Sequence, residues 1–248
     1  MQLSELPVVE WYACFQGEGP QRGRPSTLLR LSGCNLACKW KREDGSEQIC
    51  DTAYTVPAFT KPLVFDKIPI EELVQLLKGQ MTAHHINHLI ISGGEPMLYA
   101  ERVKEFILQL RLEMEPIQLF IEIETNGTIA PLSGMEVDQW NVSLKLPSSG
   151  NQSEKTHIPI AIQRFAKLSF LGVVIFKFVV AQMSDFDEIK ALLLKYTIPE
   201  RAVWIMPEGV DRERIAKWGA AIAPEVLEEG FNFTLRDHII LWGQERYK

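Results

Sequence analysis

The sequence has few cysteines, no long apolar run and no block of basic residues, and each absence excludes a class of protein. Its 248 residues include 4 cysteines, which are too few and too unevenly placed for a disulfide framework. The longest apolar stretch, at 170–180, is interrupted by Gly172 and Lys177, so no membrane-spanning helix is predicted. The net charge of -6 comes without a Lys/Arg block, which argues against nucleic acid as the main partner.

An export signal is also missing from the first residues, because positions 1–11 mix polar and apolar side chains and include Glu5 and Glu10. Free thiols without an export signal indicate a cytoplasmic protein. The length suits one large α/β domain or two small ones. No internal repeat or linker divides the chain. We therefore expect a single domain spanning 1–248.

Strand-like and helix-like apolar patterns alternate along the chain, which predicts βαβ units and a parallel sheet. The expected strands are Thr27–Leu31, His88–Ser92, Leu119–Glu124, Trp140–Leu144, Val173–Val180 and Val203–Met206. Six strands are too few for a closed eight-stranded barrel. We therefore predict an α/β fold with an open, partial TIM-like (β/α)6 barrel.

Helical periodicity occupies several of the intervals between these strands. One helix is predicted from Ile70 to a stop at Gly79, and another around 103–110. A third is expected to be capped by Ser184 with Asp187 and to run through Leu194. In parallel α/β folds the chemistry lies at the carboxyl ends of the strands, so motifs found there are candidates for function.

Three of the four cysteines lie in one loop after the first predicted strand. Cys34 and Cys38 follow Gly33, and Cys50 closes the loop in the sequence Cys50-Asp51-Thr52. Thiolates are soft metal ligands, and four-iron clusters are held by cysteine, one per iron. Three cysteines would therefore leave one iron open to a cofactor.

A structural zinc site is the alternative reading of this loop. Zinc sites of three cysteines use a histidine as the fourth ligand, and no histidine lies between Cys34 and Cys50. The charged residues at 41–48 also separate Cys50 from the other two cysteines. We therefore favour an iron–sulfur cluster. Cys14, upstream of the loop, is predicted to be a packed thiol.

The segment Ser92-Gly93-Gly94-Glu95-Pro96 follows the second predicted strand and precedes a helix. Paired glycines let a ligand approach the backbone closely, although the same pattern also occurs in ordinary strand-to-helix turns. Other polar groups follow later strands, at 124–127 and 143–145. His84, His85 and His88 lie where a helix passes into a strand and are predicted to be solvated or capping rather than metal-binding.

The cysteine loop combined with this glycine element resembles the radical S-adenosylmethionine (SAM) superfamily. More narrowly, the chain is similar to the 7-carboxy-7-deazaguanine synthase family over nearly its whole length. The motifs that carry this resemblance are Phe15-Gln16-Gly17-Glu18-Gly19, Gly23-x-Pro25, Arg30, Gly33-Cys34-Asn35-Leu36, Cys50-Asp51-Thr52, Glu124-Thr125-Asn126-Gly127, Ser143-x-Lys145, Arg236-Asp237-His238 and Leu241-Trp242-Gly243.

The resemblance implies a barrel of the radical SAM type that holds a 4Fe-4S cluster, SAM and Mg2+. It implies a lyase of queuosine and 7-deazapurine biosynthesis, in which a 5′-deoxyadenosyl radical takes a hydrogen atom from 6-carboxy-5,6,7,8-tetrahydropterin. Ring contraction and loss of ammonia then give 7-carboxy-7-deazaguanine. A flavodoxin or ferredoxin as electron donor and a homodimer are also implied, with no nucleic-acid or membrane partner.

The resemblance also implies roles for individual residues. The cluster ligands are Cys34, Cys38 and Cys50, and Thr52 contacts Mg2+. The residues expected at SAM are Ile49, Asp51, Gly94, Ser143, Leu144, Lys145, Pro207 and Glu208. Those expected at the substrate are Phe15, Gln16, Gly17, Arg30, Ser92 and His238. No catalytic residue is assigned beyond the cluster and SAM.

Several of these roles have ordinary structural alternatives. Arg30 would bind the substrate carboxylate or form a buried salt bridge; Thr52 would bind the ion or cap a helix. Lys145 would otherwise be solvated, and His238 would be a core histidine. The Gln16–Gly19 run and Pro207-Glu208 would otherwise be turns.

The chain departs from the family in the cluster loop 33–52, where an insertion at 41–49 replaces the usual short second spacing. In the family an aromatic residue precedes the last cysteine. In this chain Trp40 matches that residue in type, whereas Ile49 matches it in position, directly before Cys50. Two other functions stay open on the sequence. One is a glycyl-radical activating enzyme that acts on a protein, and the other is a non-catalytic metal-binding regulatory module.

Overall fold

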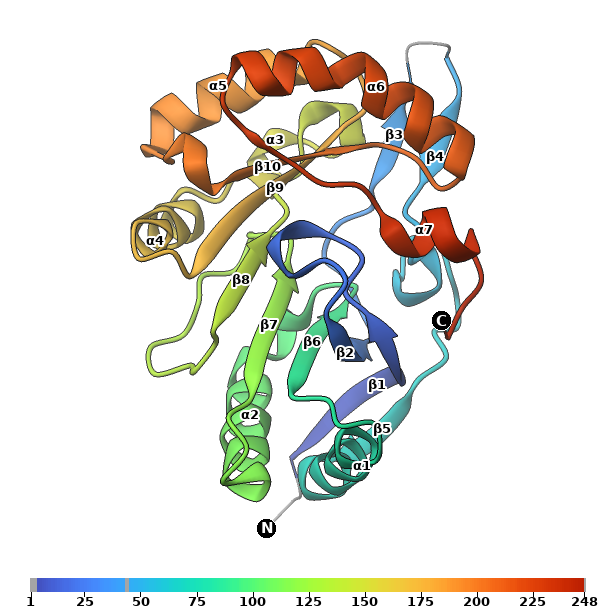
Figure 1. The fold of residues 1–248 in the computed structure, drawn as a ribbon, viewed down its shortest axis with the longest axis vertical. Helices are drawn as coiled ribbons and strands as arrows, with labels where there is room; N and C mark the ends of the chain where they lie inside the picture. The colour runs from blue at the N-terminus through green and yellow to red at the C-terminus, as the bar shows by residue number, and fades with distance from the viewer. Residues whose placement is uncertain (1–3, 43–44, 248) are drawn as a thin grey trace.

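The computed structural model describes residues 4–42 and 45–247, and its centre is a nine-stranded sheet with the order β11-β10-β9-β8-β7-β6-β2-β1-β5 (Figure 1). The strands β2, β6, β7, β8, β9, β10 and β11 run parallel to one another. Their bounds are Pro25–Leu31, His88–Gly93, Phe120–Thr125, Gln139–Val142, Val174–Val180, Val203–Pro207 and Asn232–Phe233. The six predicted strands and the open, partial barrel are confirmed.

Two antiparallel strands extend one edge of this sheet. β1 (Glu5–Phe15) pairs with β2, and β5 (Asp66–Pro69) pairs with β1. A separate hairpin is formed by β3 (Lys39–Lys41) and β4 (Glu47–Ile49). None of these strands was predicted. β1 was missed because Pro7 and Glu10 interrupt its apolar pattern.

Most of the helices cover the outer side of the sheet, whereas α7 (Asp237–Trp242) lies on its inner side (Figure 1). The other helices are α1 (Ile70–Ala83), α2 (Ala100–Met114), α3 (Ser153–Thr156), α4 (Pro159–Ser169), α5 (Asp185–Tyr196) and α6 (Arg212–Glu228). The short 3-10 turns are η1 (Gly19–Gln21), η2 (Ala53–Thr55), η3 (Pro96–Tyr99), η4 (Pro147–Ser149) and η5 (Glu200–Ala202). Among these described helices, none is both long and apolar enough to span a bilayer.

One predicted helix end and one predicted capping bond were wrong. α1 continues through Gly79 to Ala83 because the next turn places Met81, a fully buried side chain, in the core. Ser184 precedes α5 but makes no side-chain capping bond. The carboxylate of Asp185 instead binds the turn before the helix, since its Oδ2 accepts from the backbone N–H of Ala181 at 2.8 Å.

The two faces of the parallel sheet have different chemistry, as the two-residue period of a strand dictates. Side chains that face the helices are apolar and form the core, for example Leu31, Ile91 and Phe178. The opposite face carries polar side chains near the carboxyl ends of the strands, among them Arg30, Ser92, Glu124 and Lys177, and these line a cavity. The sheet therefore presents a charged inner wall at the end where chemistry was expected.

Candidate active site

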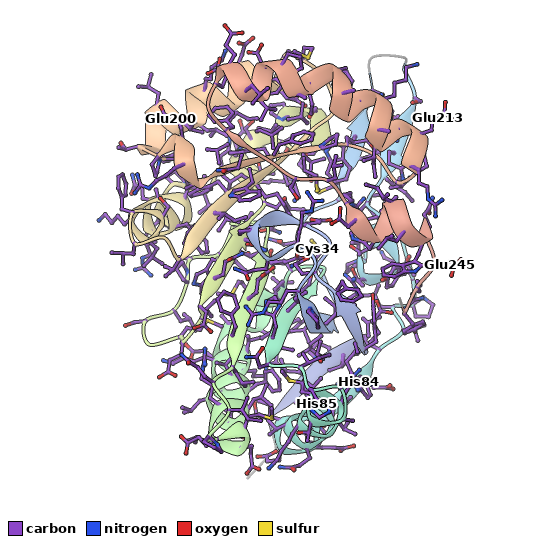
Figure 2. All side chains as sticks on the ribbon, viewed as in Figure 1. Cys34, His84, His85, Glu200, Glu213 and Glu245 are labelled. Atoms are coloured by element: carbon purple, nitrogen blue, oxygen red, sulfur yellow. The ribbon has the colours of Figure 1, made fainter. Side chains whose placement is uncertain are left out.

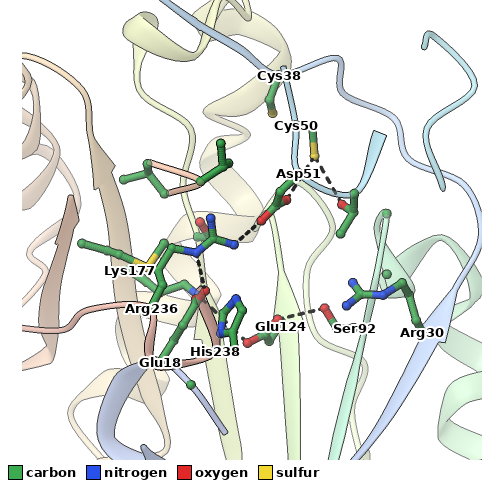
Figure 3. Close-up of a pocket in the computed structure, with 18 of the residues that line it drawn as sticks. Glu18, Arg30, Cys38, Cys50, Asp51, Ser92, Glu124, Lys177, Arg236 and His238 are labelled. Carbon is green, nitrogen blue, oxygen red and sulfur yellow. Dashed lines mark hydrogen bonds and ion pairs between the residues drawn. The ribbon is translucent and has the colours of Figure 1, made fainter. Parts of the chain in front are cut away.

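A cavity of about 280 Å³ lies at the carboxyl ends of the strands. Its walls come from the first strands, the cysteine loop and the C-terminal segment. In Figure 3 the thiols of Cys38 and Cys50 project into it from one side, while Arg30 and Lys177 lie across it. Among the predicted site residues, all except Leu144 line this cavity. Leu144 is buried in the core, so its side chain does not face a ligand there.

The insertion in the cysteine loop folds as the β3–β4 hairpin, in which Lys39 pairs with Ile49. The hairpin begins directly after Cys38 and ends directly before Cys50. As a result, the backbone N–H of Cys50 donates to the carbonyl of Cys38 at 3.0 Å. The long sequence gap is therefore short in space. The predicted insertion at 41–49 includes residues 43–44, which lie outside the described residues.

The cysteine geometry distinguishes between the two metal readings. Cys34, Cys38 and Cys50 all line the cavity, yet no three His, Cys, Asp or Glu side chains among the described residues are arranged to hold a single ion. Zinc requires its ligands within about 2.3 Å of one centre. A four-iron cluster instead binds each thiolate at a different iron, so its ligands stand further apart. Three thiols at one cavity are the donor set that a four-iron cluster with one open iron takes from a protein.

The thiols are not arranged as free nucleophiles. Burial raises the pKa of the Cys34 thiol to about 11 and that of Cys50 to about 12. Reactive cysteines show the opposite shift, toward lower pKa values. These thiols are therefore protonated near neutral pH in the metal-free protein, and a metal would have to displace their protons. Cys14, on β1, lines the same cavity, and burial raises its pKa to about 12.

The glycine element brings the end of β6 against the cysteine loop. A Cβ on Gly94 would overlap the carbonyl of Gly33 and lie 2.9 Å from the Cβ of Cys34. Glu95 then ties this turn to the end of β7, because its carboxylate accepts from Met97 N at 3.0 Å, Thr125 Oγ1 at 2.7 Å and Asn126 N at 2.6 Å. Gly94 therefore permits the approach, while the Glu95 side chain is used internally.

A network of buried charges closes the cavity on the side of the C-terminal segment (Figure 3). The carboxylate of Glu18 forms ion pairs with Lys177 of β9 and Arg236, and Arg236 also pairs with Asp51 beside Cys50. Burial would raise the pKa of Glu18, but Lys177 and Arg236 hold it well below its usual range. Ion pairs therefore connect the segment after β1, strand β9 and the segment before α7 with one another and with the cysteine loop.

Arg30 forms a salt bridge and also faces the cavity. Its Nε donates to Glu10 Oε1 at 2.7 Å, which is the buried salt bridge that the sequence left open as an alternative. The guanidinium nevertheless points into the cavity (Figure 3). The ion pair with Glu10 therefore orients a cation toward any ligand there.

Gln16 and Gly17 support the opposite wall. The amide of Gln16 is already used, since Nε2 donates to Glu122 and Oε1 accepts from Glu18 N at 3.2 Å. Gly17 is packed so closely against His238 that a Cβ would overlap the imidazole Nδ1. His238 therefore lines the cavity only because residue 17 has no side chain.

Other predicted contacts are partly occupied by protein groups. Lys145 Nζ donates to Ser143 Oγ at 2.7 Å, and Glu208 accepts from Arg42 Nε at 2.7 Å and Nη2 at 2.9 Å. Thr52 Oγ1 lies 3.3 Å from Cys50 Sγ. The described 3-10 turn after Thr52 has no side-chain capping bond, so the capping alternative lacks its hydrogen bond.

The prediction for the three histidines was right for two of them and wrong for His88. His84 and His85 are exposed and lie far from Cys34 (Figure 2). His88 is fully buried, and its Nδ1 lies 2.7 Å from Ser26 Oγ. Its Nε2 lies 3.4 Å from Glu122 Oε2, and neither of these two atoms has another partner among the described residues. His88 begins β6, as the predicted strand required, but its side chain is buried against Ser26 and Glu122 instead of being solvated.

The Glu122 carboxyl gives a testable pH dependence in the cofactor-free protein. Burial raises its pKa from 4.5 to about 8, so the folded state holds a proton that the unfolded state has lost. Burial lowers the pKa of His88 from 6.5 to about 4, and this histidine is neutral in both states above pH 6.5. The free energy of unfolding should therefore fall as pH rises from 6.5 to 8, by on the order of a few kcal/mol.

Glu122→Gln, which keeps the shape and the acceptor of the carboxyl, should remove this slope and make the protein more stable than wild type at pH 9. Urea denaturation at a series of pH values measures both effects. An equal slope in the variant and the wild type would show that Glu122 is ionised in the folded protein.

Three residues of the charge network were missed or given no role. Lys177 is the one cation in β9, which otherwise reads VIFKFVV, and Glu122 alternates with Glu124 in β7. A charge within an apolar strand signals a polar inner face, so both could have been found. Arg236 was noted only as part of a motif, because its partners are distant in sequence.

Known proteins provide an independent comparison. No family model matches the chain. The chain is 30% identical over 259 residues to the 7-carboxy-7-deazaguanine synthase of Halobacterium salinarum, a match that covers 96% of this chain and 91% of that protein. It is 30% identical over 253 residues to the synthase of Rhodopirellula baltica, covering 98% and 89%.

The fold is also shared with a solved structure. The crystal structure of QueE from Escherichia coli matches with a TM-score of 0.67 at 19% identity, covering 93% of each chain. The likeness in fold accompanies sequence identity that extends over nearly the full length of several relatives. The chain belongs to the 7-carboxy-7-deazaguanine synthase family.

Proposed function

We propose that this chain is a radical SAM lyase that converts 6-carboxy-5,6,7,8-tetrahydropterin to 7-carboxy-7-deazaguanine with loss of ammonia. The observation that carries the proposal is the meeting of three cavity-facing thiols and an oriented guanidinium in one small cavity. A volume of about 280 Å³ is of the order found in small-molecule sites. This size favours a small substrate over the protein substrate of a glycyl-radical activating enzyme.

In this proposal Cys34, Cys38 and Cys50 hold a 4Fe-4S cluster, and Gly94, Ser143 and Lys145 lie beside the space left for SAM. When bound, the cluster and SAM would supply the radical chemistry that removes a hydrogen atom from the substrate. Trp40 and Ile49 both line the cavity, so either side chain can pack on the adenine. Glu208 is held by Arg42 and would shape this wall rather than carry a free charge.

The substrate side of the cavity is formed by Arg30, Ser92 and His238. The guanidinium is held by Glu10 and would bind the substrate carboxylate. Ser92 Oγ donates to Glu124 Oε2 at 2.8 Å, which orients that carboxylate on the inner face of β7. The amide of Gln16 is engaged by Glu122, so its contribution is to fix the loop that also holds Gly17.

Three further parts of the proposal follow from the family resemblance. They are a Mg2+ ion at Thr52, a flavodoxin or ferredoxin as electron donor, and a homodimer. The hydroxyl of Thr52 lines the cavity next to Cys50, and hydroxyl oxygen is an acceptable ligand for a hard cation.

An anaerobic turnover assay tests the proposal. Reconstituted protein receives dithionite, SAM, Mg2+ and 6-carboxytetrahydropterin, and mass spectrometry follows 5′-deoxyadenosine and the 7-deazaguanine product. Both should appear. Formation of 5′-deoxyadenosine alone would retain the radical chemistry and overturn the substrate, whereas absence of both from a protein with a full cluster would overturn the proposal.

Arg30→Lys should raise KM for the pterin about tenfold or more while KM for SAM changes little. Lysine keeps the charge opposite Glu10 but loses the planar pair of donors that a carboxylate requires. Arg246→Ala is the matched control, since Arg246 donates to the other oxygen of Glu10 at 2.5 Å from a side chain 46% exposed. Equal increases in both KM values for Arg30→Lys would remove its role in binding the substrate carboxylate.

A further inference from the structure

Asn151 contacts the cysteine loop through its side-chain amide. It follows the η4 turn and precedes α3. Its Oδ1 accepts from the backbone N–H of Ala37 at 3.1 Å, and its Nδ2 donates to Cys38 Sγ at 3.2 Å. The same nitrogen lies 3.1 Å from Ser149 Oγ. The Asn151 carboxamide therefore binds both the thiol of Cys38 and the backbone N–H of the preceding residue, Ala37.

The turn that carries Asn151 is packed directly on the cysteine loop. Gly150 has a φ of +74°, and a Cβ at this position would lie 2.8 Å from the carbonyl oxygen of Lys39. The turn therefore meets residues 37–39 through both backbone and side chain. This close packing holds the amide nitrogen of Asn151 at the sulfur, so the contact does not depend on a mobile surface side chain.

The other two thiols have different partners. Cys34 Sγ accepts from the backbone N–H of Leu36 at 3.5 Å, and Cys50 Sγ lies 3.3 Å from Thr52 Oγ1. Among the described residues, Asn151 therefore provides the shortest N–H···S contact to the three cysteines. Its donor is neutral, so it adds a directed dipole at one sulfur and no net charge to the cavity.

We propose that Asn151 is a positioning residue that orients Cys38 and raises the reduction potential of the cluster bound there. An N–H donor at a thiolate sulfur stabilises the electron-rich state of a cluster, and such hydrogen bonds are among the features that set its potential. Reduction adds one electron from dithionite, with no bond formed or broken at Cys38. The inference rests on the proposed function, because it requires Cys38 to be a cluster ligand.

The test is a potentiometric titration of reconstituted protein. Wild type, Asn151→Ala, Asn151→Asp and Gln152→Ala are compared by iron and sulfide content and by the electron paramagnetic resonance signal of the reduced cluster. Asn151→Asp keeps the acceptor for Ala37 N and replaces the N–H donor with an oxygen. Gln152→Ala changes the exposed neighbour in the same turn and serves as the control.

With iron content equal to wild type, the midpoint potential of Asn151→Ala should shift to lower values and that of Asn151→Asp should shift further. Gln152→Ala should match wild type. If Asn151→Ala binds less iron than wild type, the midpoint potential of Asn151→Asp is the one compared with wild type. An unchanged potential in a variant with a full cluster would overturn the inference, while a wild-type protein that assembles no cluster would overturn the proposed function instead.

Discussion

Replacement of Cys34, Cys38 or Cys50 by alanine is expected to abolish both cluster assembly and turnover. Each thiol would supply the protein's bond to a different iron, so each variant would lack the protein ligand of one iron. Cys14→Ala is the matched control, because Cys14 lines the same cavity and burial raises the pKa of its thiol as well. This variant should keep its full iron content.

Iron and sulfide analysis of anaerobically reconstituted variants, with their absorption spectra, measures this effect. The free energy of unfolding of each cofactor-free variant should stay near that of wild type, which separates ligand loss from misfolding. Retention of iron by Cys50→Ala together with its loss from Cys14→Ala would show that the ligand set is wrong. The structural interpretation of the hairpin would then be wrong as well.

Lys177→Met is expected to lower the free energy of unfolding by about 3 kcal/mol or more. Lys177 is only 7% exposed at its side chain, pairs with Glu18 and lies 3.8 Å from Glu124. Without Lys177, Glu18 and Asp51 share Arg236 and Glu124 loses this cation, and an uncompensated buried charge costs about 3–5 kcal/mol. Methionine keeps most of the volume, so the loss reports the charge rather than a cavity.

Lys190→Ala provides the comparison in urea denaturation. Lys190 also has a carboxylate partner, Glu229, at 3.0 Å, but its side chain is 41% exposed, and exposed pairs contribute at most about 1 kcal/mol. The double variant Glu18→Gln/Lys177→Met should be less destabilised than the sum of its single changes, because both buried charges are then removed. A Lys177→Met effect no larger than that of Lys190→Ala would contradict a buried network.

The elements of the parallel sheet were predictable because each strand is a short apolar run with turn residues on both sides. β6 and β9 show this most clearly, since their burial on the helix side selects Ile, Leu, Val and Phe. β1 was not predictable in this way. It lies at an antiparallel edge, and its inner positions include Tyr12 and Cys14, which line the site and are not part of the core.

The candidate site was predictable where its residues lie in compact motifs. The cysteine loop and the glycine turn are local in sequence, and their chemistry can be inferred from residue type and spacing. The partners of Glu18 are 159 and 218 residues away along the chain, so only the folded structure shows them. Asn151 gives even less warning, because an asparagine in a polar turn is usually explained by the turn itself.

The hairpin between Cys38 and Cys50 makes the length of the cysteine loop independent of the distance between its ligands. The hydrogen bond from the backbone N–H of Cys50 to the carbonyl of Cys38 fixes the separation of these two residues at the base of the hairpin. Residues could therefore be added or removed beyond that base without moving either sulfur, provided that both strands change together and keep the pairing of Lys39 with Ile49. The length of this hairpin can thus change while the spacing between Cys38 and Cys50 stays constant.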